Sequence, residues 1–289
     1  PMEVIILMYI DFHSHFDSSD PAKVREFVNT CHANDCMAAM CGGRCYGGKG
    51  FIDGGYDMVP NDDVIKLCHE YSDTLIPLAK IDLWDGPVDL SELRRWVDMG
   101  AKGIKLIYPY YRYDDDRYMP FYEEAEKLGL PLLFHTGLYT FHDADAVYHR
   151  PVQENMSPLC LDRIARSFPK LNIVAAHLGT ELHREQCAII VQNLNNLYFD
   201  LAGGGNFWAV TPERLAHLMK GNADWARSPN SERYRKMIFG SDSYVSKPAA
   251  QKEAIWAYRN MLFRNFVSDE DFADIMGGTV ASWMGIKLN

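Results

Sequence analysis

The 289-residue chain is 47% hydrophobic and 24% charged, which is enough apolar material to bury a large core. A net charge of −10 argues against a nucleic-acid partner and against an anionic membrane surface. Seven cysteines, an odd number, do not indicate a disulfide framework, and no apolar stretch approaches the roughly 20 residues of a membrane helix. We therefore expect a cytoplasmic protein that neither binds nucleic acid nor enters a membrane. A homodimer is possible, but the sequence shows no apolar surface pattern that would identify its interface.

Short apolar runs alternate with helical patterns along nearly the whole chain. The first run, residues 4–10, is predicted to be a buried strand that leads directly into His13 and His15. A helix over residues 21–31 follows, with Asp20 as its N-cap and Pro21 at its first position. The other strands are expected at residues 36–41, 75–81, 103–107, 132–135, 172–177, 197–201 and 237–240, and the other helices at 61–71, 91–99, 120–128, 158–168, 182–194, 211–219 and 249–263.

This alternation predicts the fold class. Repeated strand–helix units form parallel sheets with right-handed crossovers. Eight such units without a linker or a break in composition favour a closed (β/α)8 TIM barrel over a doubly wound sheet. We expect a single α/β domain over residues 1–289, with a C-terminal helical extension from about residue 269.

Ionisable side chains gather where the predicted strands end. The first strand ends in His13 and His15, the fifth in His135, the sixth in His177 and the eighth in Asp242. Residues i and i+2 of a strand point to the same side, and the catalytic residues of such barrels lie at the carboxyl ends of the strands. Imidazoles with a carboxylate suit zinc or another borderline divalent ion, which lowers the pKa of a bound water to about 7. The pattern predicts a catalytic metal site.

The sequence resembles the amidohydrolase superfamily, specifically the branch called amidohydrolase 2, which includes aminocarboxymuconate semialdehyde decarboxylase. The resemblance spans nearly the full chain, and its segments occur in order at plausible barrel spacing. No single segment is strongly specific, but the set is. The matching segments are residues 11–15, 100–106, 129–137, 168–179 and 239–242.

The resemblance implies a role for each strand-end residue. His13, His15 and His135 would bind the metal, and Asp242 would be a ligand that also accepts a proton from the attacking water. His177 would stand just off the metal, where it orients or deprotonates water or polarises the substrate. The resemblance implies one divalent ion, zinc before manganese, with a second ion possible.

Two further residues have open roles. Lys105 lies in the fourth predicted strand, where binuclear relatives carry a carboxylated lysine that bridges two metals. It is alternatively a ligand for a substrate carboxylate, or a residue that merely lines the barrel. Arg150, in the long loop after the fifth strand, is either a second carboxylate ligand or part of a solvated loop.

Three functions are weighed. The first is a metal-dependent hydrolase that cleaves an amide, ester or lactone bond in a small molecule by metal-activated water. The second is a nonoxidative decarboxylase, a lyase acting on an unsaturated or aromatic carboxylic acid at the same site. The third, a non-enzymatic barrel, is disfavoured because all five metal and acid–base positions are filled. The products separate the first two: uptake of solvent oxygen against release of carbon dioxide.

Overall fold

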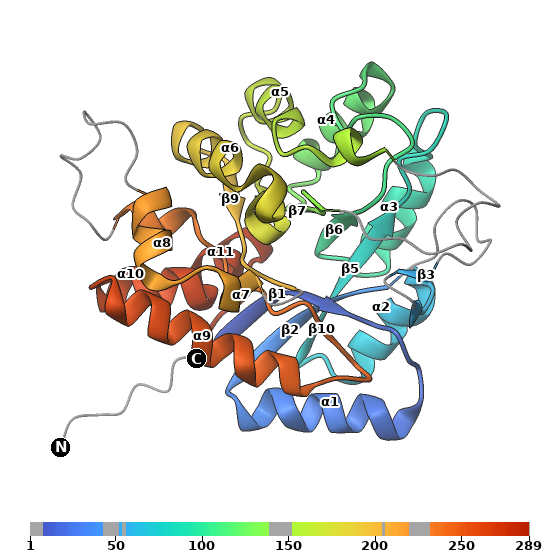
Figure 1. Cartoon of the computed structure of the whole chain (residues 1–289). Coiled ribbons are helices and arrows are strands. Elements are labelled where there is room, and N and C mark those ends of the chain that lie inside the picture. The colour runs from blue at the N-terminus through green and yellow to red at the C-terminus, as the bar shows by residue number, and fades with distance from the viewer. Residues whose placement is uncertain are drawn as a thin grey trace.

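Eight parallel strands form one curled sheet in the computed structural model of the chain (Figure 1). The structure describes residues 8–42, 52–53, 56–138, 152–203, 206–219 and 232–288, and every structural statement below refers to these residues. Neighbouring strands follow the order β10-β1-β2-β5-β6-β7-β8-β9. The strands are β1 (Tyr9–His15), β2 (Cys36–Cys41), β5 (Leu75–Ile81), β6 (Gly103–Leu106), β7 (Leu132–Phe134), β8 (Ile173–Ala175), β9 (Leu197–Phe199) and β10 (Ser243–Tyr244), with a separate antiparallel pair β3 (Ile52–Asp53) and β4 (Tyr56–Asp57).

The last strand segment closes the sheet on itself. Met237 forms a parallel bridge with Phe199 at the end of β9, and Ser243 in β10 pairs with Ser14 in β1. One segment therefore contacts both edges, and the predicted TIM barrel is confirmed. The predicted strand at 237–240 is displaced, because regular pairing occurs only at β10. Residues before the β10 pairing still hydrogen-bond to both neighbours, for example Ile238 N to Phe199 O at 2.8 Å.

Helices cover the outside of the barrel, as the alternation predicted. Figure 1 shows α1 below the sheet in this view and α4, α5 and α6 above it. The N-cap prediction is confirmed, since the Asp20 side chain accepts hydrogen bonds from the backbone of Ala22 and Lys23 at the start of α1. The helices are α1 (Pro21–Ala33), α2 (Asn61–Glu70), α3 (Leu90–Asp98), α4 (Met119–Lys127), α5 (Cys160–Ser167), α6 (Thr180–Asn193), α7 (Asn206–Ala209), α8 (Pro212–Leu218) and α9 (Ala249–Arg264).

The C-terminal extension is broken rather than one continuous helix. It consists of α10 (Asp269–Ala273), a π-helical turn (Asp274–Gly278) and α11 (Thr279–Met284). The turn presses on β1, because a Cβ atom on Gly277 would lie 2.8 Å from Ile10 N. The Trp283 ring packs edge-on against Phe12, with 6.2 Å between centroids. Thus α11 covers the end of the barrel where β1 begins, which we call the closed end.

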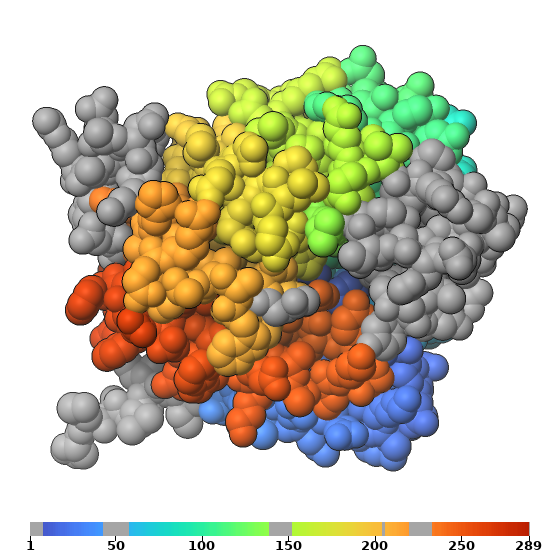
Figure 2. Space-filling view, viewed as in Figure 1, coloured from blue at the N-terminus to red at the C-terminus, as the bar shows by residue number. Residues whose placement is uncertain are grey.

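The first and last parts of the chain pack together. Helix α1 contacts α9, and Figure 2 shows the blue N-terminal segment beside the orange and red C-terminal segments. No helix in the described ranges is long and apolar enough to cross a membrane. The single-domain organisation, the homodimer and the cytoplasmic location stay predictions.

Candidate metal centre

The predicted strand ends meet at the end of the barrel opposite α11, which we call the mouth. His13 and His15 lie in β1, His135 follows β7, and His177 lies in the 3-10 turn Ala176–Gly179 after β8. Asp242 directly precedes β10. The mouth holds a cavity of about 580 Å³, which suits a small molecule. Its lining includes His13, His15, Lys105, Ile107, Tyr108, His135, Leu138, His177, Thr180, Glu181, Gly203, Asn206, Asp242, Tyr244, Lys247 and Ala250.

Several residues at the mouth have left-handed backbone conformations that L-residues rarely adopt. The φ angles are 66° at His177, 46° at Leu178, 51° at Thr180 and 59° at Asp242. Each such conformation costs of the order of 1–3 kcal/mol and persists only where the surroundings hold it. Thr136 is one such holder, because its hydroxyl donates to Ala176 O at 2.6 Å and accepts from Gly179 N at 3.2 Å. Because strain of this kind clusters at active sites, the turn and Asp242 are candidates for a functional role.

Three side chains form a compact group of metal-binding atoms. His13, His177 and Asp242 each offer one ligand atom, and these atoms lie within 4.8 Å of one another. His15 joins through Asp242, with 2.7 Å between Nε2 and Oδ1. His135 joins through His177, with 3.1 Å between Nδ1 and Nε2. The structure thus brings all five predicted residues together, but it places His177 in the compact group, where the resemblance implied His15 and His135.

The hydrogen bonds of His13 and His177 turn their nitrogen lone pairs toward this group. A carbonyl oxygen only accepts, so His177 Nδ1 carries the proton that it donates to Ala202 O at 2.7 Å. The Lys105 ammonium only donates, and it donates to His13 Nε2 at 2.7 Å. His13 Nδ1 therefore donates to Asp200 Oδ2 at 2.9 Å. His177 Nε2 therefore presents a lone pair beside the Asp242 carboxylate, whereas the lone pair of His13 Nε2 accepts from Lys105. Imidazole nitrogens beside a carboxylate are the donor types of a divalent metal, and a metal bound by His13 would replace the hydrogen bond from Lys105.

The charge states agree with this fit. Burial, followed by the charge of Lys105, lowers the pKa of His13 well below its ordinary value, and burial does the same at His135. Burial opposes ionisation of Asp242, but the neighbouring histidines outweigh it and hold its pKa far below the usual range. Burial likewise opposes charge on His15, yet Cys41 and Asp242 outweigh it and raise the pKa of His15 well above its ordinary value. A metal requires an ionised carboxylate and neutral imidazoles. His13, His135 and Asp242 meet that requirement, whereas His15 beside the Asp242 carboxylate does not.

Asp200 is a site residue that the sequence reasoning missed. It directly follows β9, is 1% exposed, and accepts hydrogen bonds from His13 Nδ1 and from His177 N. Burial raises the pKa of Asp200 against the lowering effect of His177. A carboxylate behind a ligating histidine orients the ring and increases its basicity. A signal was available, because Asp200 is the penultimate residue of the predicted strand 197–201.

Gly203 makes room for the group. Its φ of +75° favours glycine, and a side chain there would overlap Asp242 Oδ2 and come within 3.0 Å of His177 Cε1.

Lys105 is 1% exposed and contacts His13, so it belongs to the site rather than only to the barrel lining. Its bridging or substrate-binding role stays a prediction. Arg150 lies outside the described residues.

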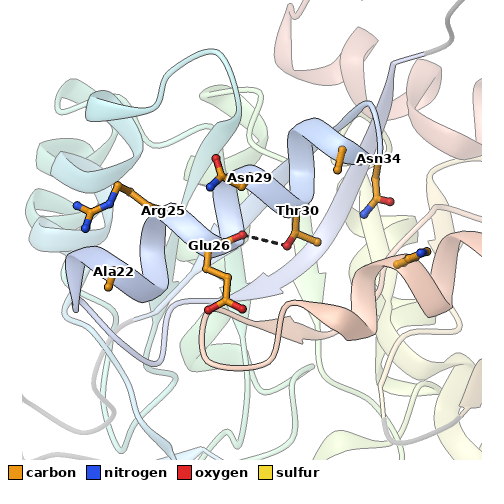
Figure 3. A pocket seen from close by; sticks show the side chains of 8 residues that line it. Ala22, Arg25, Glu26, Asn29, Thr30 and Asn34 are labelled. Atoms are coloured by element: carbon orange, nitrogen blue, oxygen red, sulfur yellow. Dashed lines mark hydrogen bonds between the residues drawn. The ribbon is translucent and has the colours of Figure 1, made fainter.

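A second hollow of about 650 Å³ lies along the outer surface of α1 (Figure 3), and Lys252 of α9 contributes to its lining. Its lining includes Arg25, Glu26, Asn29 and Thr30, and the Thr30 hydroxyl donates back to Glu26 O within the helix. Most of these side chains are exposed and none is buried. Solvated side chains of this kind are ordinary helix surface, so we assign the chemistry to the mouth.

A TIM barrel with histidines and an aspartate at its strand ends defines the class as a metal-dependent enzyme of the amidohydrolase superfamily. The chain belongs to the amidohydrolase family, whose family model matches residues 10–281. The resemblance seen in the sequence is confirmed. A search of the curated proteins found no match.

Solved structures share the fold at low sequence identity. An uncharacterised TIM-barrel protein from Bordetella bronchiseptica is 17% identical, with a TM-score of 0.62 over 96% of this chain and 98% of that one. A probable 2-pyrone-4,6-dicarboxylic acid hydrolase from Acinetobacter baumannii is 15% identical, with a TM-score of 0.62 over 96% of this chain and 100% of that one. A uronate isomerase from Bacillus halodurans is 11% identical, with a TM-score of 0.54 over 94% of this chain and 70% of that one. At these identities the likeness shows the fold and not the reaction.

Proposed function

We propose that this enzyme is a hydrolase that cleaves an amide, ester or lactone bond in a small molecule. The observation that supports this most is the convergence of His13, His177 and Asp242 in the cavity at the mouth. The Nε2 lone pair of His177 and the ionised carboxylate of Asp242 face the same cavity, as a metal-assisted hydrolase requires. His13, His177 and Asp242 would hold a divalent ion, zinc before manganese by donor type, and that ion would polarise a carbonyl and lower the pKa of a water molecule.

The chain's own residues then move the proton. Asp242 lies at the centre of the group and accepts the proton of the attacking water. His15 Nε2 lies 2.7 Å from Asp242 Oδ1 and donates a hydrogen bond to it, which favours the ionised carboxylate that accepts this proton. His177 lines the cavity with its Nδ1 proton committed to Ala202 O, so Nε2 is the nitrogen that orients the water or contacts the substrate.

Nonoxidative decarboxylation of an unsaturated or aromatic acid is the second candidate. Its support is the aromatic lining of the cavity: Tyr108 packs edge-on against His135 and Tyr244 stacks on His15, with Lys105 nearby. Planar rings suit a planar unsaturated substrate, and a lysine suits its carboxylate.

Metal content tests the centre. The wild type, His13→Ala and the control His217→Ala, an exposed histidine on α8, are reconstituted with zinc or manganese and assayed by elemental analysis. We expect about one equivalent in the wild type and the control, and a loss in His13→Ala. Two equivalents would support Lys105 as a bridging ligand. No metal in the reconstituted wild type would overturn the proposal.

Isotope labelling tests the reaction. The metal-loaded enzyme is offered lactones, esters and amides in water enriched in oxygen-18, and unsaturated acids in the same medium. Hydrolysis places one solvent oxygen in the product. Carbon dioxide released without solvent oxygen in the organic product would replace hydrolysis by decarboxylation.

A further inference from the structure

We propose that Asp11 is a positioning residue: its carboxylate holds residues 241–243 against β1 and thereby keeps Asp242 in its left-handed conformation beside His13 and His177. The inference rests on the metal centre of the proposed function, where Asp242 is a ligand. Asp11 is buried in β1, and the cavity at the mouth is lined by other residues of the described chain. Asp11 therefore acts through its neighbours and not on a substrate.

Three consecutive backbone N–H groups around Asp242 have acceptors, and Asp11 accounts for two of them. Ser241 N donates to Asp11 Oδ1 at 2.9 Å, and Ser243 N donates to Ser241 Oγ at 3.0 Å. The Ser241 hydroxyl in turn donates to Asp11 Oδ2 at 2.5 Å. The middle group, Asp242 N, donates to His13 O at 2.7 Å. Asp11 thus fixes the backbone on both sides of Asp242, directly at Ser241 and through one hydroxyl at Ser243.

The same carboxylate also fixes the strand that carries His13. The pairing of β1 with β2 shifts register between Asp11 and Ser14, and irregularities of this kind re-aim side chains. Within this stretch His13 N donates to Asp11 Oδ1 at 3.2 Å, and the Ser14 hydroxyl donates to Asp11 Oδ2 at 2.9 Å. One buried group therefore links the segment that carries His13 to the segment that carries Asp242.

The backbone of Asp242 needs this support. Its φ of 59° is unfavourable for an aspartate and persists only where the surroundings hold it. Ser14 and Ser241 are buried, so their hydroxyls and the Ser241 N–H would lose their acceptor in the protein interior if Asp11 were removed. Residues 241–243 would then separate from β1. The φ of Asp242 could relax, and its carboxylate would turn away from the two imidazoles.

Zinc affinity tests whether this support reaches the metal ligands. Asp11→Ala and Asp11→Asn are compared with the matched control Asn196→Ala. Asn196 is buried just before β9, and its side chain donates to three backbone carbonyls away from the mouth. Its loss should therefore weaken the fold and leave the mouth intact. All measurements are made at pH 8, above the value of about 6 to which burial raises the pKa of Asp11, so that its carboxylate stays an acceptor.

Zinc dissociation constants are measured by competition with a chelator. We expect a rise of about 10-fold or more in Asp11→Ala and no change in Asn196→Ala. Asp11→Asn should recover most of the loss. Its amide oxygen still accepts from the backbone of His13 and Ser241, and serine hydroxyls can accept from its amide nitrogen.

Equal zinc affinities in Asp11→Ala and Asn196→Ala would overturn the proposal, and so would an Asp11→Asn variant that is no better than Asp11→Ala. If Asp11→Ala does not fold, Ser241→Ala takes its place, because it removes the hydroxyl that links Asp11 to Ser243 N. A weaker affinity in Ser241→Ala would support the proposal, and an unchanged one would overturn it.

Amide hydrogen exchange tests the role of Asp11 without any metal. In the metal-free protein, mass spectrometry follows exchange in a peptide that contains residues 241–243. We expect faster exchange of this peptide in Asp11→Ala than in the wild type, and no acceleration in Asn196→Ala. Unchanged exchange in Asp11→Ala would overturn the proposal. If the wild type binds no zinc, the proposed function fails, whereas the exchange measurement still decides whether Asp11 holds this segment.

Discussion

The mouth and the closed end of the barrel are built from the same strands, yet they differ in almost every physical respect. At the closed end, Ile10, Ile76 and Val174 pack with the buried side chains of α11. At the mouth, His177 and Asp242 combine burial or near-burial, ionisable groups and left-handed backbone. Apolar burial stabilises, whereas buried charge and backbone strain cost stability. The difference indicates that the closed end contributes favourably to the free energy of folding, whereas the mouth contributes unfavourably.

The largest expected effect is on turnover, when the charge of Asp242 at the mouth is removed. Asp242→Asn keeps the shape but loses the proton acceptor and the metal ligand, so we expect turnover to fall by about 10²–10⁴-fold. The melting temperature should fall little, because the substitution removes the cost of burying a charge at the same time as it removes the stabilising contacts of that charge. Steady-state kinetics and thermal melting measure both quantities. Asp98→Asn, at the exposed end of α3, is the control. Full activity in Asp242→Asn would contradict the role of Asp242.

Shortening a buried side chain at the closed end should lower stability and leave activity unchanged. Ile76, in β5, is 3% exposed and lies in the cluster that α11 covers. Ile76→Ala should lower the free energy of unfolding by about 2–5 kcal/mol, because it leaves a cavity in a packed interior. Denaturant titration measures this, and activity per folded molecule should persist. Ile189→Ala, at a position 60% exposed, is the matched control and should change little. A large loss of activity without a loss of stability would refute the division between the two ends.

The smallest expected effect is on the pH dependence of the free energy of unfolding, through a charged residue away from the metal centre. Burial lowers the pKa of Lys236 from 10.5 to about 8, and its ammonium donates to Leu194 O at 2.6 Å and Asn195 O at 2.8 Å. Between those pH values the unfolded chain holds more protons than the folded one, so the free energy of unfolding should rise as pH increases from about 8 to 10.5. Denaturant titration across this range, with Lys236→Met as the comparison, checks the sign. The same slope in the variant would assign it to other groups.

Particular residues show how far the sequence reasoning reached. Most strand and helix positions followed from periodicity, and His13, His15, His135, His177 and Asp242 were found because each ends a predicted strand. The first strand is an exception: it was predicted at residues 4–10, of which 4–7 lie outside the described residues, and β1 spans Tyr9–His15 with both histidines inside it. Asp200 lies near the end of another predicted strand, but a single carboxylate there carries no pattern that separates a ligand from a structural residue. The contact between Cys41 and His15 depends on the register between β1 and β2, which no local pattern contains.

The sequence by itself determined the barrel and the family, because local periodicity and residue type carry that information, and it predicted the set of metal-binding residues. Only the tertiary structure decided which donor atoms converge, that Asp200 accepts hydrogen bonds from His13 and His177, and that the C-terminal extension breaks at its π-helical turn to cover the closed end. The physical reason is the separation along the chain between the residues that interact. Strand and helix patterns are set by neighbours a few residues apart, whereas His13 meets Asp200 across 187 residues through the closure of the sheet.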